Sequence, residues 1–68
     1  MAKLPLAIME RLLKEAGAER VSQDAKEALA EVLEDYALGI GKDASLLSEH
    51  AGRKTVRKED VKLAAKKK

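Results

Sequence analysis

The feature that most constrains this chain is a helical pattern that continues without a proline from Ser22 to His50. Ser22 is a favourable N-cap, Asp24 places negative charge in the first turn, and Gly52 supplies a C-terminal stop. The pattern predicts one helix of about 27 residues, roughly 40 Å long. Its apolar residues keep helical spacing throughout, at Leu29, Val32, Leu33, Tyr36, Ile40, Ala44 and Leu47.

A helix of this length is too long for a compact chain of 68 residues, whose diameter would be about 28 Å. Two short flanking helices cannot cover all of its apolar positions. A second copy of the long helix, crossing the first, would cover them. We therefore expect an obligate dimer in which folding and association are one event. The predicted dimer core consists of Leu29, Val32, Leu33, Tyr36 and Ile40.

A short helix is predicted on each side of the long one. The first follows Pro5, which suits a first helical turn, and it ends at Gly17, where a left-handed cap is expected. The last can start at Thr55, with Glu59 and Asp60 in its first turn. Residues 1–68 are thus predicted to form a single all-α domain with the order short helix, loop, long helix, loop, short helix.

The composition excludes several classes of protein. The chain has no cysteine and 46% apolar residues, so disulfides and wholesale disorder are not expected. No apolar run approaches the roughly 20 residues that span a bilayer, and the N-terminus lacks an apolar run of signal-peptide type. We expect a soluble, cytoplasmic protein that does not act at a membrane.

Charge is unevenly distributed along the chain. Residues 21–50 carry two basic and seven acidic side chains, whereas residues 51–68 carry eight basic and two acidic ones. Residues 1–20 are nearly balanced, with four basic and three acidic side chains. One interpretation is a solvated acidic helix followed by a flexible basic tail. The other is a surface that binds a polyanion where the two ends of the chain meet.

Four segments resemble the archaeal histones. They are Leu4-Pro5, residues 16–22 (AGAERVS), residues 50–56 (HAGRKTV) and Glu59-Asp60-Val61. The resemblance extends over nearly the whole chain. It implies the histone fold and a handshake dimer in which the two long helices cross, which agrees with the dimer expected from the length of the predicted helix.

The resemblance also implies which residues contact DNA. The first loop of one chain would lie beside the second loop of the other, so that Arg20 neighbours the partner's Lys54 and the partner's Thr55. This pair of loops would hold the DNA backbone, with Arg20 reaching into the minor groove. Arg11 and Lys14 would contribute a central contact surface from the paired first helices.

Further roles follow from the same resemblance. Arg53 and Asp60 would form an intrachain ion pair that fixes the second loop. Leu47, His50 and Asp60 would form the contact between dimers, through which dimers extend into higher oligomers on DNA. Gly17 maps to a loop position where adjacent turns of such a stack come close.

The chain departs from the family pattern at three positions. Gly39 and Gly41 lie inside the long helix, where each glycine costs about 1 kcal/mol relative to alanine. Either the glycines simply weaken the helix, or the two backbones approach closely near the dimer crossing, which is the interpretation we favour. Glu49 stands beside His50 where the family often carries a basic residue, and its charge would oppose the Asp60 of a neighbouring dimer. We therefore expect shorter or more readily opened assemblies.

The predicted function is to bind, bend, wrap and compact double-stranded DNA on the chromosome, with little sequence preference. Lys/Arg contacts release counterions from DNA, and no helix carries a row of side chains suited to reading base edges. The partners expected are duplex DNA and a second copy, with exchange for a paralogue in a heterodimer left open. Basic residues at the end of the chain, Lys66 to Lys68, are expected to be solvated.

Two other functions are less compatible with the sequence. The same dimer could be a module for protein–protein interaction, although the loop motifs and the basic C-terminal third favour DNA. An enzyme is not expected, because there is one histidine, no cysteine, no glycine-rich phosphate loop and no metal-ligand spacing. We predict no catalytic residue, metal, cofactor or small-molecule substrate.

Overall fold

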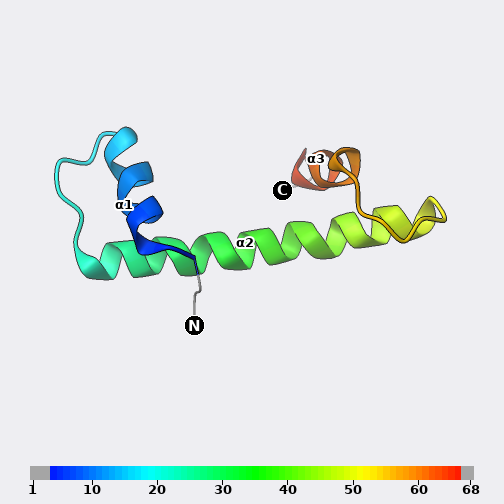
Figure 1. The fold of residues 1–68 in the computed structure, drawn as a ribbon, viewed down its shortest axis with the longest axis horizontal. Coiled ribbons are helices and arrows are strands. Elements are labelled where there is room, and N and C mark those ends of the chain that lie inside the picture. Colours follow the sequence, from blue (N-terminus) through cyan, green and yellow to red (C-terminus); the bar gives the residue numbers. More distant parts are fainter. Residues whose placement is uncertain (1–3, 67–68) are drawn as a thin grey trace. The chain divides into compact units, whose positions relative to one another are not determined.

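The structure is a computed structural model that describes residues 4–66. It contains three helices and, within those residues, no strand (Figure 1). Helix α1 comprises Leu6–Glu15, α2 comprises Gln23–His50 and α3 comprises Lys58–Lys66. The predicted all-α order of short, long and short helix is confirmed. Of the basic residues at the end of the chain, Lys67 and Lys68 lie outside the described residues.

Helices α1 and α2 end in the same way, at a glycine with positive φ. Gly17 has φ of +119° and Gly52 has φ of +74°. After α1, the N–H of Ala18 donates to the carbonyl of Leu13 and that of Gly17 to Lys14, both at 3.0 Å. After α2, the N–H of Gly52 donates to Glu49 at 2.9 Å. These are Schellman-type ends, in which glycine adopts a left-handed conformation that other residues disfavour.

The start of α2 is capped by a side chain, as the sequence predicts. The N–H of Ala25 donates to Oγ of Ser22 at 3.1 Å, and Asp24 lies in the first turn. The hydroxyl therefore satisfies one of the backbone donors that have no partner inside the helix.

The prediction that Thr55 starts the last helix is wrong. Helix α3 begins at Lys58, and the N–H of Arg57 donates to Oδ2 of Asp60 at 2.8 Å. Asp60 is the third residue of the helix, and its carboxylate caps the helix by accepting from the backbone N–H of the residue before the first turn. This is one of the two hydrogen bonds that make up a capping box. A carboxylate is a stronger acceptor than the Thr55 hydroxyl, and the Thr55 carbonyl is itself bound by the Arg53 side chain.

The chain divides into two compact units at Asp35 and Tyr36, within α2. In the first unit the buried apolar residues are Met9 and Ala30. In the second they are Ala44 and Ala64, with Ser48 and Asp60 as buried polar residues. Met9 is the one large apolar side chain among these buried residues and the others are alanines, so each unit of a single chain buries little apolar volume.

Large apolar side chains remain exposed in the single chain. Val32 is 62% exposed and Tyr36 is 49% exposed, whereas Leu29, Leu33 and Ile40 are half-buried. These five are the predicted dimer core. Others are exposed in both units: Ile8, Leu12, Leu38, Leu46, Val56, Val61 and Leu63. No helix within residues 4–66 is both long enough and apolar enough to cross a membrane.

Candidate nucleic-acid interface

The first loop presents Arg20 beside an open apolar hollow. The loop leaves α1 at Gly17 and enters α2 through the Ser22 cap, which fixes both of its ends. Arg20 is exposed and has no ion pair within the described part of the chain. The residues that line the hollow are Leu13, Ala18, Arg20, Val21, Ser22 and Ala25.

The basic residues of α1 are paired with acids of the same helix. Nε of Arg11 lies 3.6 Å from Glu15, and Nζ of Lys14 lies 3.2 Å from Glu10. Lys26 of α2 also reaches Glu10, at 3.5 Å. The hydrogen bond from Lys14, together with the charge of Lys26, lowers the pKa of Glu10. This part of the predicted DNA surface is therefore close to neutral in the free chain.

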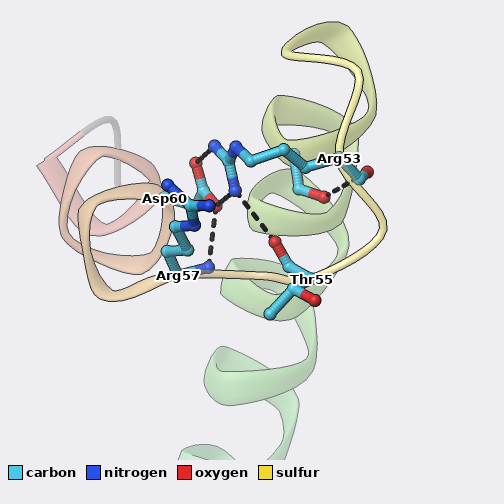
Figure 2. Close-up of polar contacts among 5 residues, drawn as sticks. Arg53, Thr55, Arg57 and Asp60 are labelled. Carbon is cyan, nitrogen blue, oxygen red and sulfur yellow. Dashed lines mark hydrogen bonds and ion pairs between the residues drawn. The ribbon is translucent and has the colours of Figure 1, made fainter.

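The second loop is organised around Arg53. Nη1 of Arg53 donates to Oδ2 of Asp60, and Nη2 donates to Oδ1, both at 3.0 Å (Figure 2). Nη1 also donates to the carbonyl of Thr55 at 2.8 Å. The predicted partners Arg53 and Asp60 thus meet in a two-pronged contact. Such contacts are more directional than those of lysine.

Asp60 is a buried carboxylate that is fully engaged. Its side chain is 7% exposed and accepts from the Arg53 guanidinium and from the N–H of Arg57. Hydrogen bonds from Arg53, and next from the Arg57 backbone, lower the pKa of Asp60. The hydrogen bond to Asp60 likewise raises the pKa of Arg53. The ion pair joins the start of the loop to the first turn of α3.

Lys54 and Thr55 occupy the part of the loop that this ion pair spans. Both residues are exposed, and Lys54 has no ion pair within residues 4–66. Asp60 neutralises Arg53, so Lys54 is the unpaired cation directly adjacent to Thr55 in the chain. The arrangement can offer an ammonium group and a hydroxyl to a phosphate.

Sequence reasoning missed Arg57 and the role of Ser48. Arg57 is an exposed cation three residues after Lys54, and its position immediately before α3 is the signal that could have identified it. Ser48 is 2% exposed, and its hydroxyl donates to the carbonyl of Arg53 at 3.0 Å. A polar residue four positions after the buried Ala44 was the available signal for Ser48.

The two loops that are predicted to meet across the dimer belong to different compact units of the chain. Arg20 belongs to the first unit, and Lys54 and Thr55 belong to the second. Their proximity across a dimer remains a prediction. The same holds for the predicted dimer–dimer residues, of which Leu47 is half-buried, Glu49 and His50 are exposed, and Asp60 is buried. Within residues 4–66, no three acidic, histidine or cysteine side chains are grouped so as to hold a metal ion.

Comparison with known proteins identifies the family. The family model described as histone-like transcription factor (CBF/NF-Y) and archaeal histone matches residues 2–65. The chain is 61% identical over 66 residues to a component of the archaeal histone HAN1 of Thermococcus zilligii, and the match covers 97% of this chain and 98% of the relative. It is 53% identical over 64 residues to the protein named probable archaeal histone 3 of Methanocaldococcus jannaschii, covering 94% and 96% of the two chains.

The matched segment contains α1, α2, both loops and all of α3 except its last residue, Lys66. The chain therefore belongs to the family of histone-like CBF/NF-Y transcription factors and archaeal histones, and it is a DNA-binding chromatin protein with the histone fold.

Proposed function

We propose that the chain forms a handshake dimer that bends and wraps double-stranded DNA with little sequence preference. The observation that carries this proposal is the second loop. In this loop the charge of Arg53 is neutralised by Asp60 of the same chain, whose two hydrogen bonds to Arg53 hold the loop backbone. Lys54 and Thr55 are left exposed on that backbone. A rigid display of one ammonium group and one hydroxyl suits a phosphate, which every DNA sequence offers.

Dimerisation rests on the exposed apolar side chains of α2. Val32 and Tyr36 are four residues apart, so they lie on one face of the helix, and both are exposed in the single chain. A second α2 crossing this face would bury them with Leu29, Leu33 and Ile40. The partner is a second copy or a paralogue with the same loops. The relative from Thermococcus zilligii is named as one component of an archaeal histone, which is in keeping with either arrangement.

In the proposed dimer, Arg20 lies beside the partner's Lys54 and the partner's Thr55. The loop arginine enters a narrow minor groove, where the electrostatic potential is most negative. Arg11 and Lys14 add contacts only after exchanging their pairing acids for phosphate, since Glu15 and Glu10 hold them in the free chain. The chromosome is the location that this function implies.

Stacking of dimers is proposed at the end of α2, through Leu47, His50 and Asp60, with Gly17 allowing close approach of successive turns. Glu49 is exposed next to His50. Its negative charge disfavours approach to an acidic neighbour, so we propose short or easily opened stacks. Nuclease digestion of reconstituted complexes tests this, because Glu49→Arg should lengthen the protected fragments. Equal fragment lengths for the two proteins would count against the role of Glu49.

A binding titration with a duplex of about 100 base pairs at fixed salt tests DNA binding. Arg20→Ala and Lys54→Ala should each weaken binding by about tenfold, since two copies of each contact are lost per dimer. Lys42→Ala is the matched control, because Lys42 is an exposed lysine of α2 outside both loops. Equal affinities for the loop variants and the control would contradict the assigned surface.

A module for protein–protein interaction is the second candidate. The acids that neutralise Arg11 and Lys14 favour it, because they reduce the positive field over α1. Failure of the unmodified dimer to shift any duplex at physiological salt would favour this function over DNA binding.

A further inference from the structure

The feature that carries a further inference is Ser48, a polar residue in an otherwise apolar position of α2. It is 2% exposed, four residues after the fully buried Ala44. Its hydroxyl has one hydrogen bond, to the carbonyl of Arg53 at 3.0 Å. Burial of a hydroxyl is unfavourable unless it is hydrogen-bonded, so its direction is fixed by this acceptor.

Ser48 binds both main-chain polar groups of Arg53. The N–H of Arg53 donates to the carbonyl of Ser48 at 3.0 Å, while the carbonyl of Arg53 accepts from the Ser48 hydroxyl. The first bond belongs to the Schellman-type end of α2 and needs no particular side chain. The second depends on the hydroxyl alone. One residue of α2 therefore fixes the backbone of Arg53 on both sides of its Cα.

The carbonyl that Ser48 holds belongs to the peptide group joining Arg53 to Lys54. Because a peptide group is planar, fixing its oxygen also fixes the N–H and the bond to Cα of Lys54. On the far side of the exposed pair, the carbonyl of Thr55 is held by Nη1 of Arg53 at 2.8 Å. The peptide groups before Lys54 and after Thr55 are thus both anchored, the first of them through Ser48.

The geometry points to Ser48 as a positioning residue for DNA binding: its buried hydroxyl sets the direction in which the side chains of Lys54 and Thr55 project from the loop. This inference rests on the proposed function, since it concerns how the loop meets phosphate. Ser48 does not contact DNA itself. It acts through its hydrogen bond to the Arg53 carbonyl, which holds the loop to α2. The Arg53–Asp60 ion pair holds the same loop to α3.

The test compares Ser48→Ala with Ser45→Ala, which removes an exposed hydroxyl three residues earlier in the same helix. Alanine favours helix, so both variants keep α2. Hydrogen exchange of the dimer without DNA should show the two hydrogen-bonded loop amides, those of Arg53 and Arg57, exchanging about five- to tenfold faster in Ser48→Ala, and unchanged in Ser45→Ala. Unchanged exchange in both variants would overturn the inference.

DNA affinity is then measured in two backgrounds at one salt concentration, the unmodified dimer and Lys54→Ala/Thr55→Val. Ser48→Ala should weaken binding about three- to tenfold in the first background and leave it unchanged in the second. A purely structural role predicts the same loss in both, and that result would refute positioning. If Lys54→Ala/Thr55→Val itself binds DNA like the unmodified dimer, the proposed function fails first. If that variant weakens binding but Ser48→Ala does not, the positioning inference alone fails.

Discussion

Arg53 and Asp60 are seven residues apart, yet their side chains meet in two hydrogen bonds of 3.0 Å (Figure 2). The same carboxylate accepts from the N–H of Arg57 and so caps α3. One buried acid thus holds the loop closed and starts the following helix. Removing its charge should disturb both elements together.

Asp60→Asn should lower the melting temperature of the dimer by about 5 °C or more, because an amide cannot accept from both guanidinium nitrogens and the Arg57 N–H. Thermal unfolding at fixed protein concentration measures the change, since the melting temperature of a dimer depends on concentration. Asp35→Asn is the control, because Asp35 is exposed on α2. Equal shifts for the two variants would contradict the bracing role of Asp60.

The Asp60 pair also predicts a pH dependence. Arg53 and the Arg57 backbone lower the pKa of Asp60 below its ordinary value of 3.8. The unfolded chain therefore binds this proton more readily than the folded one, so the stabilisation is complete above about pH 5 and is lost as pH falls below 4. The stability difference between the unmodified dimer and Asp60→Asn should shrink over that interval. A difference that is constant from pH 6 to pH 3 would contradict this.

The two glycines of α2 should respond differently to alanine. Within one chain a Cβ at Gly41 would meet no atom within 4 Å, and Gly41 is exposed and lies five residues after Tyr36, about 140° around the helix from the face proposed for dimerisation. Gly41→Ala should therefore stabilise the dimer by about 0.5–1 kcal/mol through helix propensity, and the expected close approach of backbones is kept for Gly39 alone. Gly39 is half-buried and lies three residues after Tyr36, towards the face proposed for dimerisation. Gly39→Ala should therefore bring no gain in melting temperature. A clear rise for Gly39→Ala would reject a close approach of backbones at that position.

Ser22→Ala should cost about 1 kcal/mol, since it removes the acceptor for the Ala25 N–H at the start of α2. Chemical denaturation of the dimer at fixed protein concentration measures this change. Ser45→Ala serves as the comparison, because Ser45 is exposed in the middle of the same helix. A loss that is no larger for Ser22 than for Ser45 would show that the cap contributes nothing.

Glu15→Gln should tighten DNA binding about two- to fivefold, because it releases Arg11 from its partner at 3.6 Å and removes a negative charge from α1. Glu31→Gln makes the same change of charge at an exposed position of α2. Titrations at one salt concentration should separate the two variants. Equal gains would mean that net charge, and not the pairing of Arg11, limits binding.

The helix order and most helix ends could be predicted from local sequence. Gly17, Gly52 and Ser22 act on residues within one turn, so their effects are visible in the chain itself. The start of α3 was mispredicted because two local acceptors compete, and the carboxylate of Asp60 prevails over the hydroxyl of Thr55. The length of α2 also anticipated that Val32 and Tyr36 would be uncovered in a single chain.

Contacts between different helices and loops were harder to predict from the sequence. Lys26 and Glu10 are sixteen residues apart, and nothing in their spacing reveals that they meet at 3.5 Å. The hydrogen bond from Ser48 to Arg53 depends on how the chain turns after Gly52, which the sequence indicates only as a stop. The pairing of Arg53 with Asp60 was expected from family resemblance, because an interaction across a loop has no periodic signature.

Sedimentation equilibrium of the purified chain, with helix content followed over the same range of concentrations, tests the central claim most directly. We predict a folded dimer whose helix content falls as dilution separates the two copies, because Val32, Tyr36 and their neighbours need a second α2 to cover them. A single copy that retains its full helix content and a cooperative thermal transition at low concentration would contradict the account.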